Sequence, residues 1–279
     1  MSETKLDGRR PGGRRLSLAA VTLRGVPPDE LAKAAAAAGF DAVGIRLSPW
    51  DPDAPVRYSA EQVRGIASLI ADLGLFTLDV EQIRLLPDTS ARDFEYLFEG
   101  AALLGARFAL IYGDDPDEER FIAQLHELGQ IGLPYGVSPV IEFMPFTALN
   151  NMAQALNILE RADLPHPALL IDTLHLARSG GSAAEIAAVD PQILPFAHLA
   201  DGPVDPPETI EGRRHEAGHA RLLPGRGQLP LEAYLRALPD GLALALEVPG
   251  ASVGTAYERA TAAAQATRDL LAGLEGDER

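Results

Sequence analysis

Apolar runs with the length of buried strands alternate with helix-like segments eight times along this chain, and this alternation constrains the fold most strongly. Each run has the apolar character of a parallel strand that is buried on both faces. We expect the strands at Leu16–Leu23, Ala42–Leu47, Leu75–Ile83, Arg107–Tyr112, Val137–Phe143, Ala168–Asp172, Ile193–Ala200 and Leu242–Val248. Eight such units within 279 residues predict a single α/β domain, a (β/α)8 TIM barrel.

Helix signals fill the segments between these runs. Ser59 has the character of an N-cap, and Gly39, Gly74 and Gly105 stand where helices should stop. We expect helices at 29–38, Ser59–Leu73, Ser90–Leu104, Asp117–Leu133, Ala148–Glu160, Ala183–Ala188, Pro230–Leu238 and Ser252–Leu274. An open doubly wound sheet is the alternative, but the first turn after a strand lacks the glycine pattern of a dinucleotide site.

Composition and charge exclude several classes of function. The chain has no cysteine, which rules out a disulfide framework and a thiolate zinc site. Its formal charge of −16 argues against binding to nucleic acid. No apolar stretch reaches the roughly 18 residues that a membrane span requires. We expect a cytoplasmic protein with a disordered tail over 1–15 and a barrel domain over 16–279, and we leave a homo-oligomer open.

Four side chains that can ligate a metal stand at the ends of the last four expected strands. They are Glu142, Asp172, His198 and Glu247. A charged side chain at the end of a buried strand is costly without a partner, and strand ends in a barrel face one pocket. Any one of the four could be a buried ion pair or a helix cap, but the matched set favours one divalent metal. Three carboxylates and an imidazole suit Mn²⁺ first, with Mg²⁺ or Co²⁺ as alternatives.

Two further polar residues stand close to expected strand ends. His175 follows Asp172 by three residues, so it could be a fifth ligand, an orienting group or a substrate contact. We favour substrate contact over a loop histidine that caps the next turn. Glu81 interrupts the apolar third strand and could bind a substrate hydroxyl. A salt bridge from Glu81 to Arg84 or Arg46 is the equal alternative.

The remaining candidates lie in connections. Trp50 is the single tryptophan and follows the second strand, where it could wall the pocket or contact a lid. The longest connection, 201–227, is expected as a polar loop that could serve as a lid, and it is basic within an acidic chain. We select Arg221 from this loop as a substrate-binding residue, with Arg214 as the alternative.

These residues together resemble the xylose-isomerase-like barrels, the sugar phosphate isomerase/epimerase superfamily. The resemblance covers nearly the whole chain after Arg15, and its short elements are jointly specific. The matching segments are Val140-Ile141-Glu142, Ile171-Asp172-Thr173-Leu174-His175, His198-Leu199-Ala200-Asp201, Leu223-Pro224-Gly225-Arg226-Gly227 and Leu246-Glu247.

The resemblance implies roles for the strand-end residues. In that family the four ligands hold one divalent metal, and in its ketose epimerases two metal-bound glutamates also move protons on opposite faces of the substrate. By this match Glu142 and Glu247 would move protons, and His175 would contact the substrate near its carbonyl or hydroxyl. The arginine of the seventh strand's loop would correspond to Arg221, with Arg214 as the second choice.

Two reactions are compatible with this residue set. The leading expectation is a metal-dependent isomerase or epimerase of a sugar or polyol, which takes a proton next to a carbonyl and forms an enolate. The alternative is a lyase that resembles 3-dehydroshikimate or inosose dehydratases and expels a β-hydroxyl from the same enolate. Arg226 stands where the family usually has an acidic residue, which would favour an acidic substrate such as a cyclic keto acid. A barrel that only binds a small molecule is a third option, against which the intact ligand set argues.

Overall fold

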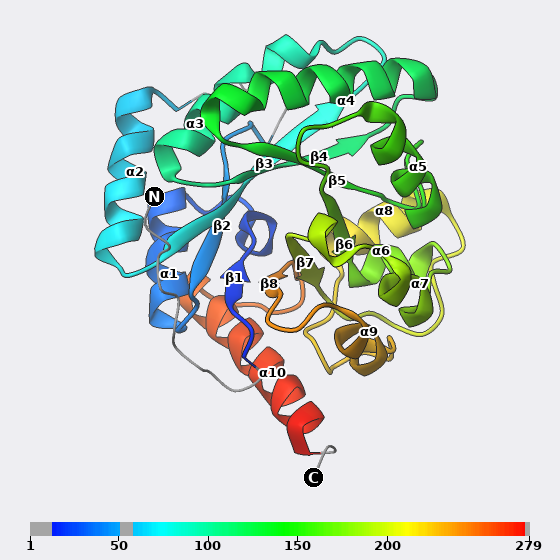
Figure 1. Cartoon of the computed structure of the whole chain (residues 1–279). Coiled ribbons are helices and arrows are strands. Elements are labelled where there is room, and N and C mark those ends of the chain that lie inside the picture. The colour runs from blue at the N-terminus through cyan, green and yellow to red at the C-terminus, as the bar shows by residue number, and fades with distance from the viewer. Residues whose placement is uncertain (1–12, 51–57, 277–279) are drawn as a thin grey trace.

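Eight parallel strands close into one barrel in the computed structural model, which describes residues 13–50 and 58–276. Every strand pairs with its successor along the chain, and the last pairs with the first (Figure 1). The strands are β1 Leu16–Leu18, β2 Ala42–Arg46, β3 Phe76–Leu85, β4 Phe108–Gly113, β5 Ser138–Glu142, β6 Leu169–Asp172, β7 Phe196–Leu199 and β8 Ala243–Leu246. The predicted TIM barrel is confirmed.

Helices surround the barrel on its outside (Figure 1). They are α1 Pro28–Ala37, α2 Ala60–Asp72, α3 Glu95–Leu104, α4 Glu118–Gly132, α5 Met152–Ala162, α6 Thr173–Arg178, α7 Ala183–Ala188, α8 Ile210–His219, α9 Leu231–Ala237 and α10 Ala256–Gly276. Ser59 caps α2 as expected, because its hydroxyl accepts from the Gln62 amide while the Gln62 side chain accepts from the Ser59 amide.

The first strand is shorter than expected. β1 ends at Leu18, and Ala20–Leu23 forms a 3-10 helix instead of continuing the strand. Thr22 holds this turn against the end of β8, because its hydroxyl donates to the Leu246 carbonyl (2.6 Å) and accepts from the Val248 amide (2.9 Å). A threonine within an apolar run therefore redirects the chain here.

Part of the expected N-terminal tail packs against the barrel. Residues 1–12 lie outside the described part of the chain. Arg14 is buried, and its guanidinium donates to the carbonyls of Leu235 and Pro239, both at 2.9 Å. The segment that precedes β1 is therefore anchored to α9 from Arg14 onward.

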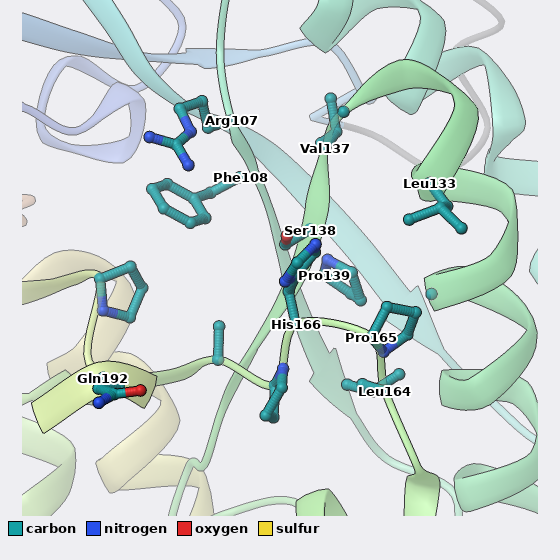
Figure 2. Close-up of a pocket in the computed structure, with 15 residues that line it drawn as sticks. Arg107, Phe108, Leu133, Val137, Ser138, Pro139, Leu164, Pro165, His166 and Gln192 are labelled. Atoms are coloured by element: carbon teal, nitrogen blue, oxygen red, sulfur yellow. The ribbon is translucent and has the colours of Figure 1, made fainter. Parts of the chain in front are cut away.

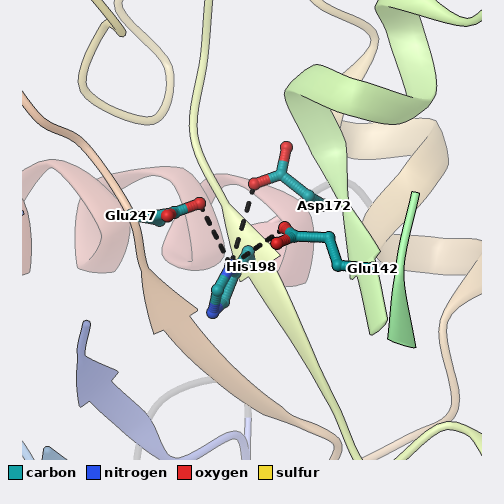
Figure 3. A group of neighbouring side chains, drawn as sticks. All are labelled: Glu142, Asp172, His198 and Glu247. Carbon is teal, nitrogen blue, oxygen red and sulfur yellow. Dashed lines mark ion pairs between the residues drawn. The ribbon is translucent and has the colours of Figure 1, made fainter. Parts of the chain in front are cut away.

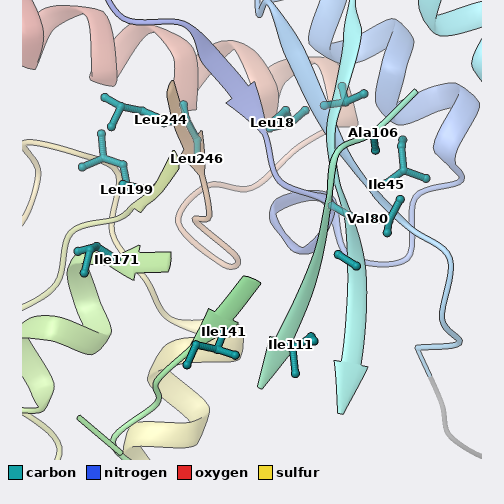
Figure 4. Packing of buried hydrophobic residues seen from close by; sticks show 14 of the residues in the cluster. Leu18, Ile45, Val80, Ala106, Ile111, Ile141, Ile171, Leu199, Leu244 and Leu246 are labelled. Carbon is teal, nitrogen blue, oxygen red and sulfur yellow. The ribbon is translucent and has the colours of Figure 1, made fainter. Parts of the chain in front are cut away.

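Alternate residues of the strands build two apolar layers. One layer lies between the strands and the helices and includes Leu18, Ile45, Val80 and Ile141 (Figure 4). A smaller cluster fills the barrel interior and includes Leu78, Leu110, Val140, Leu170 and Phe196. Because side chains alternate along a strand, the next inward position of β5, β6 and β7 lies two residues beyond this inner layer. Those positions hold polar residues.

The connection from β7 to α9 contains a helix that sequence analysis missed. Residues 201–227 were expected as a polar loop, but Ile210–His219 forms α8, which Thr209 caps by accepting from the Gly212 amide. A buried ion pair holds α8 to α6, with Arg178 Nη2 2.6 Å and Nε 2.8 Å from the two Glu216 oxygens. This tertiary contact stabilises α8, whose own sequence has no apolar face to pack against the barrel.

Asp201 closes the base of the same connection. Its backbone exchanges two hydrogen bonds with Leu222, of 3.0 and 2.9 Å. Its carboxylate accepts from the amides of Gly225, Gly227 and Leu229, at 2.8 to 3.1 Å. The two ends of the segment 202–221 are thus held together beside β7.

A cavity of about 390 Å³ opens at the end of the barrel where the strands begin (Figure 2). Phe108 and Ser138 from the starts of β4 and β5 line it, together with His166 before β6. Active sites of such barrels lie at the opposite end, where the strands finish.

None of the helices within 13–50 and 58–276 combines the length and apolar character that crossing a bilayer requires.

Two glycine substitutions test the packing of the helical layer. A Cβ on Gly132 would lie 2.2 Å from the Val137 carbonyl oxygen, whereas a Cβ on Gly65 of α2 would meet no atom within 4 Å. Gly132→Ala should therefore destabilise the protein by about 1–3 kcal/mol. Gly65→Ala should stabilise it by roughly 0.5–1 kcal/mol, because alanine loses less backbone entropy in a helix. Urea unfolding of both variants checks this pair, and equal midpoints would contradict it.

Candidate metal centre

The four predicted ligands meet at the end of the barrel where the strands finish (Figure 3). One ligand atom from each of Glu142, Asp172, His198 and Glu247 lies within 4.8 Å of the others. His198 Nδ1 is 3.1 Å from Glu247 Oε2, 3.4 Å from Glu142 Oε1 and 3.9 Å from Asp172 Oδ2. All four side chains are buried, and Glu247 is the most exposed at 12%.

Strand register brings these residues together. Asp172 and His198 are direct partners across β6 and β7, and both point inward. Glu142 ends β5, and Glu247 follows β8, where its amide donates to the Leu199 carbonyl. Asp172 has a second role as the N-cap of α6, because its Oδ1 accepts from the His175 amide at 2.8 Å. This cap leaves Oδ2 to face the centre.

Arg221 lies inside the site and not at its rim. Its side chain is 2% exposed, with Nη1 2.5 Å from Asp172 Oδ2 and Nη2 2.7 Å from Glu247 Oε2. Its Nε donates to the Ala217 carbonyl of α8 at 2.8 Å. Burial lowers the pKa of Arg221, but the two carboxylates outweigh this and raise it, so the guanidinium stays charged.

The charges of the cluster fit a divalent cation. Three carboxylates and one guanidinium leave a formal charge of −2 when His198 is neutral. Both oxygens of Glu142 and both ring nitrogens of His198 are buried and have no hydrogen-bond partner among the described residues. Buried polar atoms without partners are rare in proteins unless a ligand satisfies them. This donor set, rich in oxygen, therefore suits one divalent metal.

Without a metal, the cluster compensates for its charge by holding protons. Burial raises the pKa of Glu142 to about 7. Burial lowers the pKa of His198, but the neighbouring carboxylates of Glu247 and Glu142 raise it well above its ordinary value. Burial also raises the pKa of Glu247, yet the charges of Arg221 and His198 outweigh it and hold this pKa well below normal. Glu142 and His198 are thus the groups that a metal must deprotonate.

His175 is a neutral hydrogen-bonding group beside the ligands. Burial lowers its pKa to about 4, so the imidazole is uncharged at neutral pH. Its Nε2 lies 3.4 Å from Arg221 Nη2, which can only donate, so Nε2 is the acceptor and Nδ1 carries the hydrogen. Nδ1 is buried and has no partner within the described residues. His175 therefore has one N–H available for a bound molecule.

A cavity of about 360 Å³ lies over the cluster, and its lining is unusually basic for this chain. Glu247, His175 and Arg221 form part of its wall. The same wall includes Arg24, Arg84 and Arg214, with Asp114 as a further acidic residue. Arg84 pairs with Asp114 at 3.6 Å. Among the described residues, neither Arg24 nor Arg214 forms an ion pair with a carboxylate; their guanidinium groups instead lie near the rings of Trp50 and Phe146.

Two other predicted substrate contacts have partners elsewhere. Glu81 is buried in β3, and its Oε1 accepts from the Ala20 amide at 3.0 Å. Trp50 lies close to Arg46, whose guanidinium carbon is 4.3 Å from the ring centroid. Neither residue is among those that line the cavity over the ligands. Substrate contact by Glu81 or Trp50 stays a prediction.

The structure adds residues that sequence analysis did not select. Asp79 is fully buried in β3, two residues before Glu81, and period-two alternation along the strand was the signal that could have found it. Arg24 lines the cavity from the connection after β1, and Arg84 lines it from the end of β3. Nothing in their local sequence distinguishes these two arginines from surface charges.

Comparison with known proteins places the chain among barrels of this type. A family model described as xylose isomerase-like TIM barrel matches residues 32–273. The chain is 27% identical over 236 residues to a 3-dehydroshikimate dehydratase of Pseudomonas putida, and 27% identical over 232 residues to one of Pseudomonas aeruginosa. Each match covers 78% of this chain but 35% of the relative, so the chain spans about a third of the length of these relatives.

Solved structures share the fold. A xylose isomerase-like TIM barrel/4-hydroxyphenylpyruvate dioxygenase fusion protein superimposes with a TM-score of 0.76 at 23% identity, over 95% of this chain and 44% of that one. The IolI protein, whose structure has a bound zinc atom, superimposes with a TM-score of 0.75 at 19% identity, over 93% of this chain and 99% of that one. At these identities the likeness concerns the fold.

Metal affinity should depend on pH through the protons on Glu142 and His198. Binding must displace them, so the apparent affinity for Mn²⁺ should fall as the pH drops below about 7, by about tenfold per pH unit for each displaced proton. Isothermal titration in buffers of different ionisation enthalpy measures both the affinity and the protons released. Glu142→Gln should bind more weakly and release fewer protons. An affinity that stays constant from about pH 8 to about pH 5.5 would contradict this exchange.

Proposed function

Because the chain belongs to the xylose isomerase-like TIM barrel family, we propose that it is a metal-dependent lyase that removes water from a small cyclic hydroxy keto acid of the 3-dehydroshikimate type. One observation carries the choice of substrate. In a chain with a formal charge of −16, the cavity over the ligand cluster is lined by Arg24 and Arg214, and neither has a carboxylate partner within the described residues. A guanidinium in this position suits a substrate carboxylate.

The relatives support the same choice. Both Pseudomonas relatives carry the name 3-dehydroshikimate dehydratase, and the match covers most of this chain. Since the chain spans about a third of their length, their activity is transferred here only as part of the proposal.

The residues of the site divide the work as follows. A bound divalent ion would polarise the substrate carbonyl and acidify the neighbouring C–H. Glu142, a buried carboxylate at the end of β5 once the metal has displaced its proton, takes that proton. The proton then leaves with the departing hydroxyl as water, so the elimination is balanced without a further reagent. His175 donates its free N–H to a substrate oxygen, and Arg221 holds Asp172 and Glu247 in place.

Isomerisation or epimerisation of a sugar is the second candidate, and the pair Glu142 and Glu247 is what favours it. Epimerisation by two bases requires a second carboxylate that readily accepts a proton. Glu247 is ion-paired with Arg221 at 2.7 Å, and its pKa is held well below normal, which makes it a weak base. Elimination requires a single base, so the arrangement favours the lyase.

An assay of purified, Mn²⁺-loaded protein separates the two candidates. We expect 3-dehydroshikimate to give an ultraviolet-absorbing dehydrated product, and a panel of ketoses to give no epimer. Glu142→Gln should abolish turnover. Epimer formation with no dehydration would favour the isomerase, and a protein that binds no divalent ion would contradict both reactions.

The arginines of the cavity should determine charge specificity. Arg24→Ala and Arg214→Ala should each lower kcat/KM for the carboxylate substrate by about tenfold, since an exposed charge-assisted contact contributes on the order of 1.5 kcal/mol. Turnover of the corresponding methyl ester should change little. Arg213→Ala is the matched control, because Arg213 belongs to the same helix but does not line the cavity. Equal decreases in kcat/KM for the acid and the ester would show that these arginines do not bind the carboxylate.

A further inference from the structure

Asp79 is a buried carboxyl group without a partner. It belongs to β3, is 0% exposed, and neither of its oxygens has a hydrogen-bond partner among the described residues. Its strand partner is Gly44 of β2, and a Cβ at Gly44 would lie 2.9 Å from Asp79 Oδ1. The absence of a side chain at residue 44 therefore gives the carboxyl group room inside the barrel. A buried carboxyl group of this kind destabilises a protein unless something uses it.

His198 has an unused hydrogen-bonding atom in the same interior. Its Nδ1 faces the three carboxylates, and Figure 3 shows the rest of the ring extending away from them. Nε2 at the far end of the ring is buried and has no partner within the described part of the chain. If Nδ1 binds a metal, Nε2 must carry the hydrogen of the neutral imidazole and therefore needs an acceptor.

Strand order places these two groups opposite each other. β3 and β7 are four strands apart in either direction around the closed barrel, so they face each other across its axis. Asp79 and His198 both point inward from these strands. Burial raises the pKa of Asp79, and the neighbouring His198 opposes this increase. Glu81, the other inward carboxylate of β3, already accepts from the Ala20 amide. Asp79 is thus the carboxyl group of β3 that remains available to His198.

We propose that Asp79 is a positioning residue for the metal centre: its carboxyl group accepts the Nε2–H of His198, directly or through one enclosed water molecule. This contact fixes the tautomer in which the Nδ1 lone pair faces the other three ligands. It also gives a partner to a buried carboxyl group that has none among the described residues. The inference rests on the proposed metal site.

Manganese titration followed by electron paramagnetic resonance tests the proposal. Asp79→Leu removes the acceptor and should weaken Mn²⁺ binding by about 10–100-fold, the usual effect of losing a group that orients a ligand. Asp79→Asn keeps an acceptor oxygen and should retain most of the affinity. Thr77→Val is the matched control, because it removes another buried, unpartnered oxygen from the same strand and should leave the affinity unchanged.

Two further measurements distinguish positioning from general damage. The thermal midpoint of metal-free Asp79→Leu should equal or exceed that of the wild type, since leucine replaces a buried carboxyl group that has no partner outside the metal centre among the described residues. In ¹⁵N-histidine spectra of the zinc-loaded protein, the Nε2–H resonance of His198 should move upfield in this variant. Wild-type affinity in Asp79→Leu, or an unmoved resonance, would overturn the inference while the metal site stands. A wild type that binds no divalent ion would instead overturn the proposed function.

Discussion

Repulsion among three buried carboxylates is the interaction on which the rest of this site depends. Glu142, Asp172 and Glu247 lie within a few ångströms of one another at the end of the barrel where the strands finish, and their burial means that water screens them little. Arg221 offsets one charge, and the protons held by Glu142 and His198 offset others. The metal-free site therefore holds protons that a divalent cation displaces. Because of this exchange, the affinity of the site for metal and the pKa values of its ligands depend on each other.

Because the carboxylates repel one another, they need the positive charge of Arg221, which lies at the end of the long connection after β7. Arg221 reaches the carboxylates from the end of this connection, and its Nε is held by the Ala217 carbonyl of α8. Helix α8 is in turn fixed by the buried pair of Arg178 and Glu216. A helix that carries cavity residues such as Arg214 is thus positioned by charges that also set the geometry of the metal ligands.

Much of this arrangement was predictable because buried parallel strands have a simple signature. The strand ends that hold Glu142, Asp172 and His198 agree with the sequence expectation, since a polar residue closing an apolar run needs a shared partner. What sequence analysis missed depends on contacts between distant segments. Helix α8 lacks an apolar face and relies on a tertiary ion pair, and β1 ends early because Thr22 bonds to β8. The sequence singled out Arg221 as a substrate contact, but its pairing with the ligands Asp172 and Glu247 depends on how the connection folds back and buries the side chain.

Asp201 determines how freely the connection after β7 can change in length. By pairing with Leu222 and gathering the amides of the following turn, it joins the two ends of the segment 202–221 at a fixed point. Loop-closure entropy changes slowly with length, so insertions or deletions between these ends cost the barrel little. The stretch between residue 202 and α8 can therefore change length without disturbing the eight strands, as long as Arg221 keeps its contacts with Asp172 and Glu247. The short antiparallel bridge at Asp201 is thus a fixed base for this connection, from which Arg221 reaches Asp172 and Glu247.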